Sequence, residues 1–168
     1  MYGSLRYIVA FGLYVFFQVA ILNDLTLFHV ATPFVFLVFL FTLPFSLPVP
    51  IVYIITFITG FVIDVFSDHT ASGLHIFASL MAVAARSRIA IFVSTANYRS
   101  VDEITFRNQT AVWFVWYLLP LIFIHHLTYF FLESFSFQYF FLTMLKVVSS
   151  TLYTFFISYI LCYLFYQK

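Results

Sequence analysis

The sequence predicts an all-α integral membrane protein in which residues 1–168 form a single domain of six transmembrane helices. Hydrophobic residues make up 64% of the chain and charged residues only 8%, whereas soluble domains carry about 25% charged residues. A soluble fold of this size has too little interior to bury so much apolar surface. Six apolar runs approach the roughly 20 residues that a spanning helix needs, and the cations gather on one side of this layout.

The first three helices are bounded by polar residues and prolines. The six expected helices cover approximately residues 5–22, 33–47, 50–66, 74–94, 110–132 and 138–166. The first ends at Asn23-Asp24. The second begins at Pro33, since proline suits the first helical turn, and it ends near Leu47 because Pro48 cannot continue it. The second and third helices are short and could form a re-entrant pair, but both are apolar throughout, which favours two true spans.

The last three helices are separated by a long polar segment and by a short acidic turn. Gly73 precedes the fourth helix as a permissive turn position. Residues 95–109 form the longest polar stretch, which is most simply a solvated connector. Pro120 lies near the middle of the fifth helix, where a kink is expected. Glu133 lies near the exit of this helix, before the sixth.

The cations predict the orientation of the six-helix layout in the membrane. Every Lys and Arg except Lys146, which lies within the sixth helix, falls on one side: Arg6, Arg86, Arg88, Arg99, Arg107 and Lys168. The opposite side has the acidic residues Asp24, Asp68 and Glu133 at its loops. The positive-inside rule then places both termini in the cytoplasm. The formal net charge of +1 predicts no nucleic-acid partner.

Small and polar residues repeat every three or four positions on three helices. The three stripes are Thr56, Gly60 and Asp64; Ala78, Ala82 and Ala85; and Lys146, Ser150, Thr154, Ser158 and Cys162. Helices in lipid associate through close packing and polar contacts. We therefore interpret the stripes as helix-packing faces in preference to a substrate path.

The polar residues near the predicted membrane favour a structural role over catalysis. Asp64 lies near the end of its helix, so we expect it to cap a neighbouring helix or to pair with Lys146, with proton coupling as the alternative. For Lys146 the expected partners are Asp64 and Glu133. Neither Asp64, Asp68, His69 and His75 nor His125, His126 and Glu133 have the spacing of a known zinc motif. No nucleophile motif surrounds the serines. We expect no enzyme activity, no metal ion and no cofactor.

A set of motifs in a fixed order resembles a known family. The motifs are Gln18 with Leu22-Asn23, Ala31-Thr32-Pro33-Phe34, Gly60-x-x-x-Asp64-x-Phe66-Ser67, Gly73-x-His75, Arg86, His125-His126, Leu132 to Phe137, and Lys146 with Ser150-x-x-x-Thr154. Through them nearly the whole chain resembles the rod shape-determining MreD family, particularly its shorter Bacteroidetes-type members. That family is in turn similar in fold to the substrate-binding S-components of energy-coupling-factor vitamin transporters.

The resemblance implies a scaffold subunit of the bacterial cell-elongation machinery in the inner membrane. Its expected partner is an MreC-like single-pass membrane protein, and through it the MreB filaments, RodA and a class B penicillin-binding protein. A vitamin-binding transporter subunit is the alternative function. The candidate helix-packing or partner-contact residues are Gly60, Asp64, Ser67, Gly73, His75, Arg86, Glu133, Lys146, Ser150 and Thr154.

Overall fold

The computed structural model describes residues 2–23, 25–28, 30–67, 73–94, 110–136 and 138–165. Several residues that entered the sequence-based expectations lie outside these ranges: Asp24, Asp68, His69, Ser72, the connector 95–109 with Arg99 and Arg107, and Lys168. The expected place of these residues relative to the membrane therefore stays a prediction.

The described chain is helical, as the sequence predicts. Its elements are α1 (Tyr2–Phe17), the π-helix η1 (Gln18–Leu22), α2 (Phe36–Thr42), α3 (Val49–Val65), α4 (Leu74–Val93), α5 (Ala111–Ser134) and α6 (Phe140–Phe165). Among the described residues, four helical stretches are long and apolar enough to cross a membrane: Leu5–Leu22, Leu74–Val93, Ala111–Ser134 and Phe140–Tyr163. Helix α3 is apolar but slightly shorter. These helices indicate a multi-pass membrane protein.

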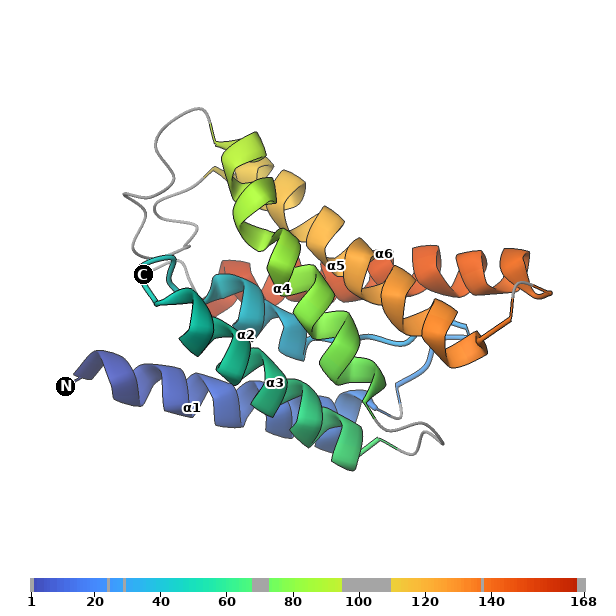
Figure 1. Cartoon of the computed structure of the whole chain (residues 1–168), viewed down its shortest axis with the longest axis horizontal. Helices are drawn as coiled ribbons and strands as arrows, with labels where there is room; N and C mark the ends of the chain where they lie inside the picture. The colour runs from blue at the N-terminus through green and yellow to red at the C-terminus, as the bar shows by residue number, and fades with distance from the viewer. Residues whose placement is uncertain are drawn as a thin grey trace.

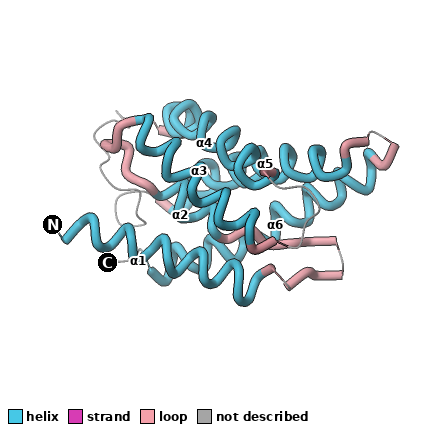
Figure 2. Tube along the Cα trace, turned by 60° about the horizontal axis from the view of Figure 1, so that its bottom comes forward, coloured by secondary structure: helices cyan, strands magenta, loops and turns pink. Residues whose placement is uncertain are grey.

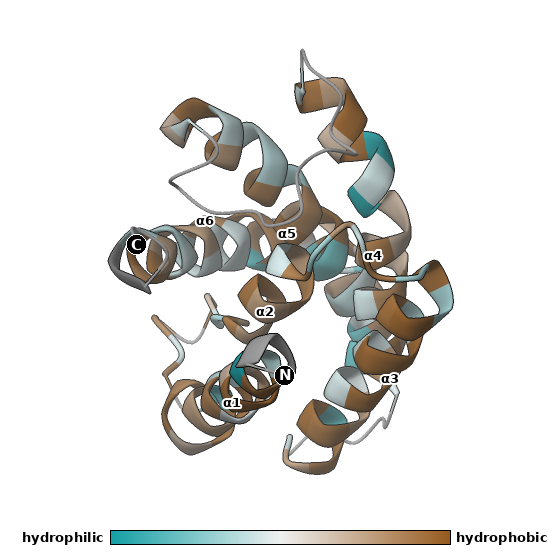
Figure 3. Cartoon of the chain, turned by 90° about the vertical axis from the view of Figure 1, so that its left-hand side faces the viewer, coloured by the Kyte–Doolittle hydropathy of each residue, from teal (hydrophilic) through white to brown (hydrophobic). Residues whose placement is uncertain are grey.

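The long helices pack in chain order around the short helix α2. Helix α4 packs against α3 and α5, and α5 packs on its other side against α6 (Figure 1). Figure 3, viewed along the bundle, shows α2 inside the arrangement, between α1, α5 and α6. All seven residues of α2 are buried. A helix that is apolar on all sides except for Thr42 fits this position, because such helices are found in the interior of a protein or in a membrane.

The second expected helix, residues 33–47, is wrong in its extent. The structure has only the seven-residue α2, which rises about 10 Å at 1.5 Å per residue. The chain before it, residues 31–35, is not helical; Figure 2 shows it as part of the pink tube between η1 and α2. The other expected bounds agree with the structure to within about three residues, inside the usual disagreement between assignments plus fraying of helix ends.

The bundle has two ends, which we call the Asp64 end and the Arg86 end. The Asp64 end is where η1 ends, α3 leads into α4, and α5 leads into α6. The Arg86 end is where α2 leads into α3 and where α4 ends beside the start of α5. At the Asp64 end, a hydrogen bond joins the end of η1 to the end of α3: Asn23 Nδ2 donates to the carbonyl oxygen of Phe66 at 3.2 Å.

Candidate functional site

The amide of Gln18 holds the non-helical segment that precedes α2. Gln18 is fully buried although α1 is mostly exposed, because it continues the helix face of Tyr7, Phe11 and Tyr14 that packs against the core. Its Oε1 accepts a hydrogen bond from the backbone N–H of Val35 at 2.7 Å. Its Nε2 donates to the carbonyl oxygen of Pro33 at 2.9 Å. One side chain therefore satisfies a backbone donor and a backbone acceptor that no helix or sheet satisfies.

Two residues of the α6 stripe perform the same task from the other side. The backbone N–H of Thr32 donates to Ser150 Oγ at 3.0 Å, and that of Phe34 donates to Thr154 Oγ1 at 3.0 Å. Both side chains are fully buried. The stripe on α6 thus provides hydrogen-bond acceptors for an unpaired backbone, beyond the close packing that its spacing predicts.

His126 completes this network on α5. Its Nε2 lies 3.1 Å from Thr154 Oγ1, and its Nδ1 lies 2.8 Å from the carbonyl oxygen of Ile122. A carbonyl oxygen can only accept, so the network assigns the proton to Nδ1. Nε2 is then the acceptor for the Thr154 hydroxyl, which leaves Thr154 Oγ1 free to accept from Phe34.

The ring of Phe34 fills the centre of the bundle toward the Asp64 end. Its centroid lies 4.7 Å from that of His75, 5.0 Å from that of His126 and 5.0 Å from that of Tyr129. His125 is 5.6 Å away and fully buried, and neither of its ring nitrogens has a hydrogen bond within the described residues. Within those residues no group of three His, Cys, Asp or Glu side chains could hold a metal ion.

Asp64 joins α3 to the start of α4. Its two carboxylate oxygens accept hydrogen bonds from the backbone N–H groups of His75 at 3.0 Å and Ile76 at 3.1 Å. These groups belong to the first turn of α4, whose N-cap is Gly73 at φ 96° and has no side chain to offer. Of the two contacts expected for Asp64, the structure therefore shows capping of a neighbouring helix. A carboxylate at this position also complements the positive end of the helix dipole.

The same joint requires a glycine one turn earlier on α3. A Cβ at Gly60 would lie 2.7 Å from the Cα of Ile76, which is too close for any side chain without a shift of one helix. Gly60 thus sets the distance between α3 and α4 at which Asp64 can reach its partners. Ser67 turns back on its own helix, where its Oγ donates to the carbonyl oxygen of Ile63 at 2.8 Å.

Glu133 and Lys146 form an ion pair at the rim of the Asp64 end. The distance from Lys146 Nζ to Glu133 Oε2 is 3.7 Å, and the side chains are 45% and 30% exposed, respectively. Lys146 therefore pairs with Glu133, one of the two partners expected for it. An ion pair this exposed contributes little stability in water. Its relevance is that it places two charged side chains on the accessible rim of the bundle.

Two phenylalanines at the Asp64 end have left-handed backbone angles. Phe135 ends α5 at φ 39° and is 89% exposed, and Phe28 lies before α2 at φ 53° and is 92% exposed. Glycine or asparagine usually occupies such a position, because Cβ makes it costly for other residues. The motif from Leu132 to Phe137 includes Phe135, but sequence reasoning did not single it out as a contact residue, and it missed Phe28. Nothing in the local pattern distinguishes the two from other aromatic residues.

Arg86 lies buried at the Arg86 end, where it satisfies the last carbonyls of α2. Its Nη2 donates to the carbonyl oxygen of Leu43, and its Nε lies 3.1 Å from Tyr117 Oη. The Tyr117 hydroxyl in turn donates to the carbonyl oxygen of Phe41 at 2.8 Å. Sequence reasoning missed Tyr117 as the partner of Arg86, because the two residues are separated by the long polar connector.

The candidate residues thus divide into groups at the two ends of the bundle. Around the Asp64 end the structure brings together Gly60, Asp64, Ser67, Gly73, His75, Glu133, Lys146, Ser150 and Thr154, whereas Arg86 stands apart at the opposite end. No protein-family model, no curated protein and no solved structure matches this chain. The family resemblance therefore rests on the sequence motifs alone.

Proposed function

We propose that the chain crosses the membrane six times, with residues 31–43 as an unusual second crossing. Residues 31–34 span about 13 Å when extended, and Val35, which has helical backbone angles, adds about 12 Å together with the seven residues of α2. Their sum, about 25 Å, approaches the roughly 30 Å of a hydrocarbon core. Non-helical backbone is tolerated at membrane depth only where protein buries it. The hydrogen bonds from Gln18, Ser150 and Thr154 support this arrangement.

The charges favour the orientation that the sequence predicts. Arg6 and Arg88 lie at the Arg86 end or beyond it, and both are accessible. The two described carboxylates, Asp64 and Glu133, lie at the opposite end. By the positive-inside rule, the Arg86 end is then cytoplasmic, the Asp64 end is extracytoplasmic, and both termini lie in the cytoplasm. The membrane that the family resemblance implies is the bacterial inner membrane.

Within this arrangement we propose that the protein is a non-enzymatic scaffold of the cell-elongation complex, as its resemblance to the MreD family implies. The motif residues support a fixed geometry, because Gln18, Asp64, Ser150 and Thr154 are engaged in hydrogen bonds between distant parts of the chain. The proposed partner is an MreC-like single-pass protein, through which the scaffold connects to MreB, RodA and a class B penicillin-binding protein.

The single observation that supports the proposed partner contact is Phe135, which is exposed and has left-handed backbone angles. Phe135 adopts an unfavourable backbone conformation but buries little of its side chain within the chain. Such a residue is a candidate for contact with another molecule. Phe135 follows Glu133 by two residues, so an aromatic side chain and the ion pair with Lys146 share one rim. Aromatic residues are enriched in protein interfaces. We therefore assign the contact with the MreC-like protein to this rim.

Vitamin binding is the alternative function, and the geometry of the bundle centre disfavours it. The space toward the Asp64 end is filled by Phe34, packed on His75, His126 and Tyr129. A ligand at this position would have to displace that ring. We expect no thermal stabilisation of the purified protein by thiamine, riboflavin or biotin, and a saturable shift with any of them would favour the transporter function.

The substitution Phe135→Asn tests the scaffold function. Asparagine tolerates the left-handed backbone, so the variant should be at least as stable as the parent in detergent. Co-purification of the MreC-like protein encoded in the same genome should fall at least several-fold. The matched control is Phe92→Asn, which removes another aromatic side chain with 90% exposure from the last turn of α4, at the Arg86 end. Equal recovery of the partner by all three proteins would refute the assigned contact.

A further inference from the structure

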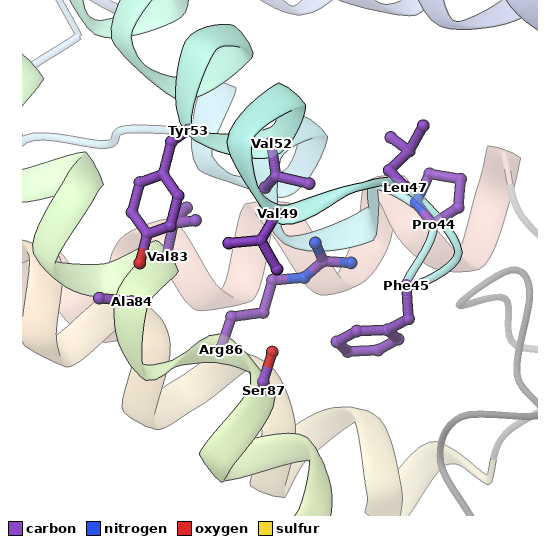
Figure 4. A pocket seen from close by; sticks show the side chains of 10 residues that line it. All are labelled: Pro44, Phe45, Leu47, Val49, Val52, Tyr53, Val83, Ala84, Arg86 and Ser87. Atoms are coloured by element: carbon purple, nitrogen blue, oxygen red, sulfur yellow. The ribbon is translucent and has the colours of Figure 1, made fainter.

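A small cavity opens beside Arg86, outside the network at the Asp64 end. Its volume is about 80 Å³, enough for several water-sized groups. Figure 4 shows the Arg86 side chain reaching between the start of α3 and the turn that connects α2 to α3. The polar side chains on its wall are Arg86, Tyr53 and Ser87, and most of the rest is aliphatic.

The charge of Arg86 is not neutralised by any described group. Its hydrogen-bond partners are a carbonyl oxygen and a hydroxyl, and its guanidinium lies 4.2 Å from the ring centroid of Phe45. The two described carboxylates are at the opposite end of the bundle. A guanidinium has five N–H donors, and two of them serve Leu43 and Tyr117. The remaining donors are available on a side chain that is only 3% exposed.

In the six-crossing arrangement proposed above, on which this inference rests for its depth, Arg86 lies near the cytoplasmic membrane surface, because it contacts Leu43 at the end of the second crossing. Its partner Tyr117 is next to Trp116, whose side chain is 64% exposed, and exposed tryptophans concentrate at the membrane–water interface. Arg88, one residue beyond Ser87 on α4, is also exposed. A phosphate group in this layer is therefore at the height of the cavity, and a guanidinium binds phosphate oxygens with two parallel hydrogen bonds.

We propose that the cavity beside Arg86 binds an anionic phosphate group. The largely aliphatic wall favours the headgroup phosphate of a membrane lipid, whose glycerol and acyl parts would lie along Val49 and Val52 of α3. The bound phosphate neutralises Arg86 while the hydrogen bonds to Leu43 and Tyr117 stay in place. This site is independent of the partner contact proposed above, because it lies at the other end of the bundle.

The test uses Ala84→Leu, which fills the cavity from its exposed wall and leaves Arg86 and its partners unchanged. The full chain is reconstituted in phosphatidylcholine or in an equal mixture of phosphatidylcholine and phosphatidylglycerol, and retained phospholipids are counted by native mass spectrometry. The parent should retain phosphatidylglycerol, and Ala84→Leu should retain at least about tenfold less. Ala20→Leu, at an exposed position near the Asp64 end, is the matched control and should behave as the parent.

Inorganic phosphate, added in a thermal-shift assay, separates the two sources of the group. Stabilisation by inorganic phosphate that Ala84→Leu removes would support the anion site with free phosphate as its ligand. Retention of phosphatidylglycerol that Ala84→Leu removes supports the lipid. Equal retention of phosphatidylglycerol by the parent and Ala84→Leu, without stabilisation by phosphate, would overturn the proposal.

Discussion

Asp64 shows how an acidic side chain can be placed in an apolar chain. Its carboxylate caps the first turn of α4 from a different helix, α3, through two backbone N–H groups. The N-cap residue Gly73 brings the φ of 96° that the turn needs but contributes no acceptor. The left-handed turn and the helix cap are thus supplied by two different residues.

Replacement of Asp64 by alanine should destabilise the protein without abolishing a chemical activity. We expect a loss of about 1–2 kcal/mol in the free energy of unfolding, the usual value of a lost helix cap. Denaturation of the purified protein by SDS in mixed micelles measures it. Asp64→Asn retains one acceptor oxygen and should lose less, whereas a proton-coupling role predicts that Asp64→Asn fails as completely as Asp64→Ala and that Asp64→Glu functions.

Gly60 and Gly12 provide a matched pair of glycine-to-alanine substitutions. Gly60→Ala places a methyl group 2.7 Å from the α4 backbone, and we expect a destabilisation of about 1–3 kcal/mol, as for other overpacked sites. Gly12→Ala meets no atom within 4 Å and should stabilise α1 by up to about 1 kcal/mol. Thermal unfolding in detergent compares the two, and similar effects would contradict the close approach of α3 and α4.

At the scale of elements, the segment that includes α2 depends on side chains from outside it. Its backbone is satisfied by Gln18 of η1, Ser150 and Thr154 of α6 and, at the C-terminal end of α2, Arg86 of α4 with Tyr117 of α5. Polar side chains on the surrounding helices thus replace the hydrogen bonds that a regular helix makes within itself.

Gln18→Leu should weaken this segment more than its small change in volume suggests. The substitution leaves the N–H of Val35 and the carbonyl oxygen of Pro33 buried without a partner, and each such group costs about 1–3 kcal/mol. We expect lower thermal stability and faster hydrogen exchange confined to residues 31–38. Phe17→Leu, at the exposed position one residue earlier, is the control; equal exchange in both variants would contradict the role of Gln18.

The long helices could be predicted from the sequence, and the second crossing could not. Apolar runs bounded by Pro48, Gly73 and Glu133 determine α3, α4 and α5 locally. The extent of α2 depends on acceptors at Ser150 and Thr154, more than a hundred residues away in the chain, which no local pattern shows. The α6 stripe was visible as a period of four, but such a period does not reveal whether its hydroxyls face a helix or an extended chain.

At the scale of the whole molecule, six crossings and the charge distribution predict which surfaces face each compartment. A cysteine at Ser46, an exposed residue in the turn between α2 and α3, should react with a membrane-impermeant maleimide only from the cytoplasmic side. A cysteine at the exposed Gln138 should react only from the other side. The native Cys162 is buried and should stay unlabelled. Absence of cytoplasmic labelling at Ser46 in permeabilised cells would indicate a re-entrant pair instead of two crossings.

The hydrogen bonds that α6 accepts from the segment before α2 have a consequence for the biogenesis of the protein. The ribosome makes α6 long after this segment, yet Ser150 and Thr154 are needed to shield the N–H groups of Thr32 and Phe34 from lipid. A nascent chain released before α6 has no equivalent acceptors for them. The second crossing should therefore be held at the translocon or at the membrane surface until α6 has been synthesised, and membrane integration should proceed out of chain order.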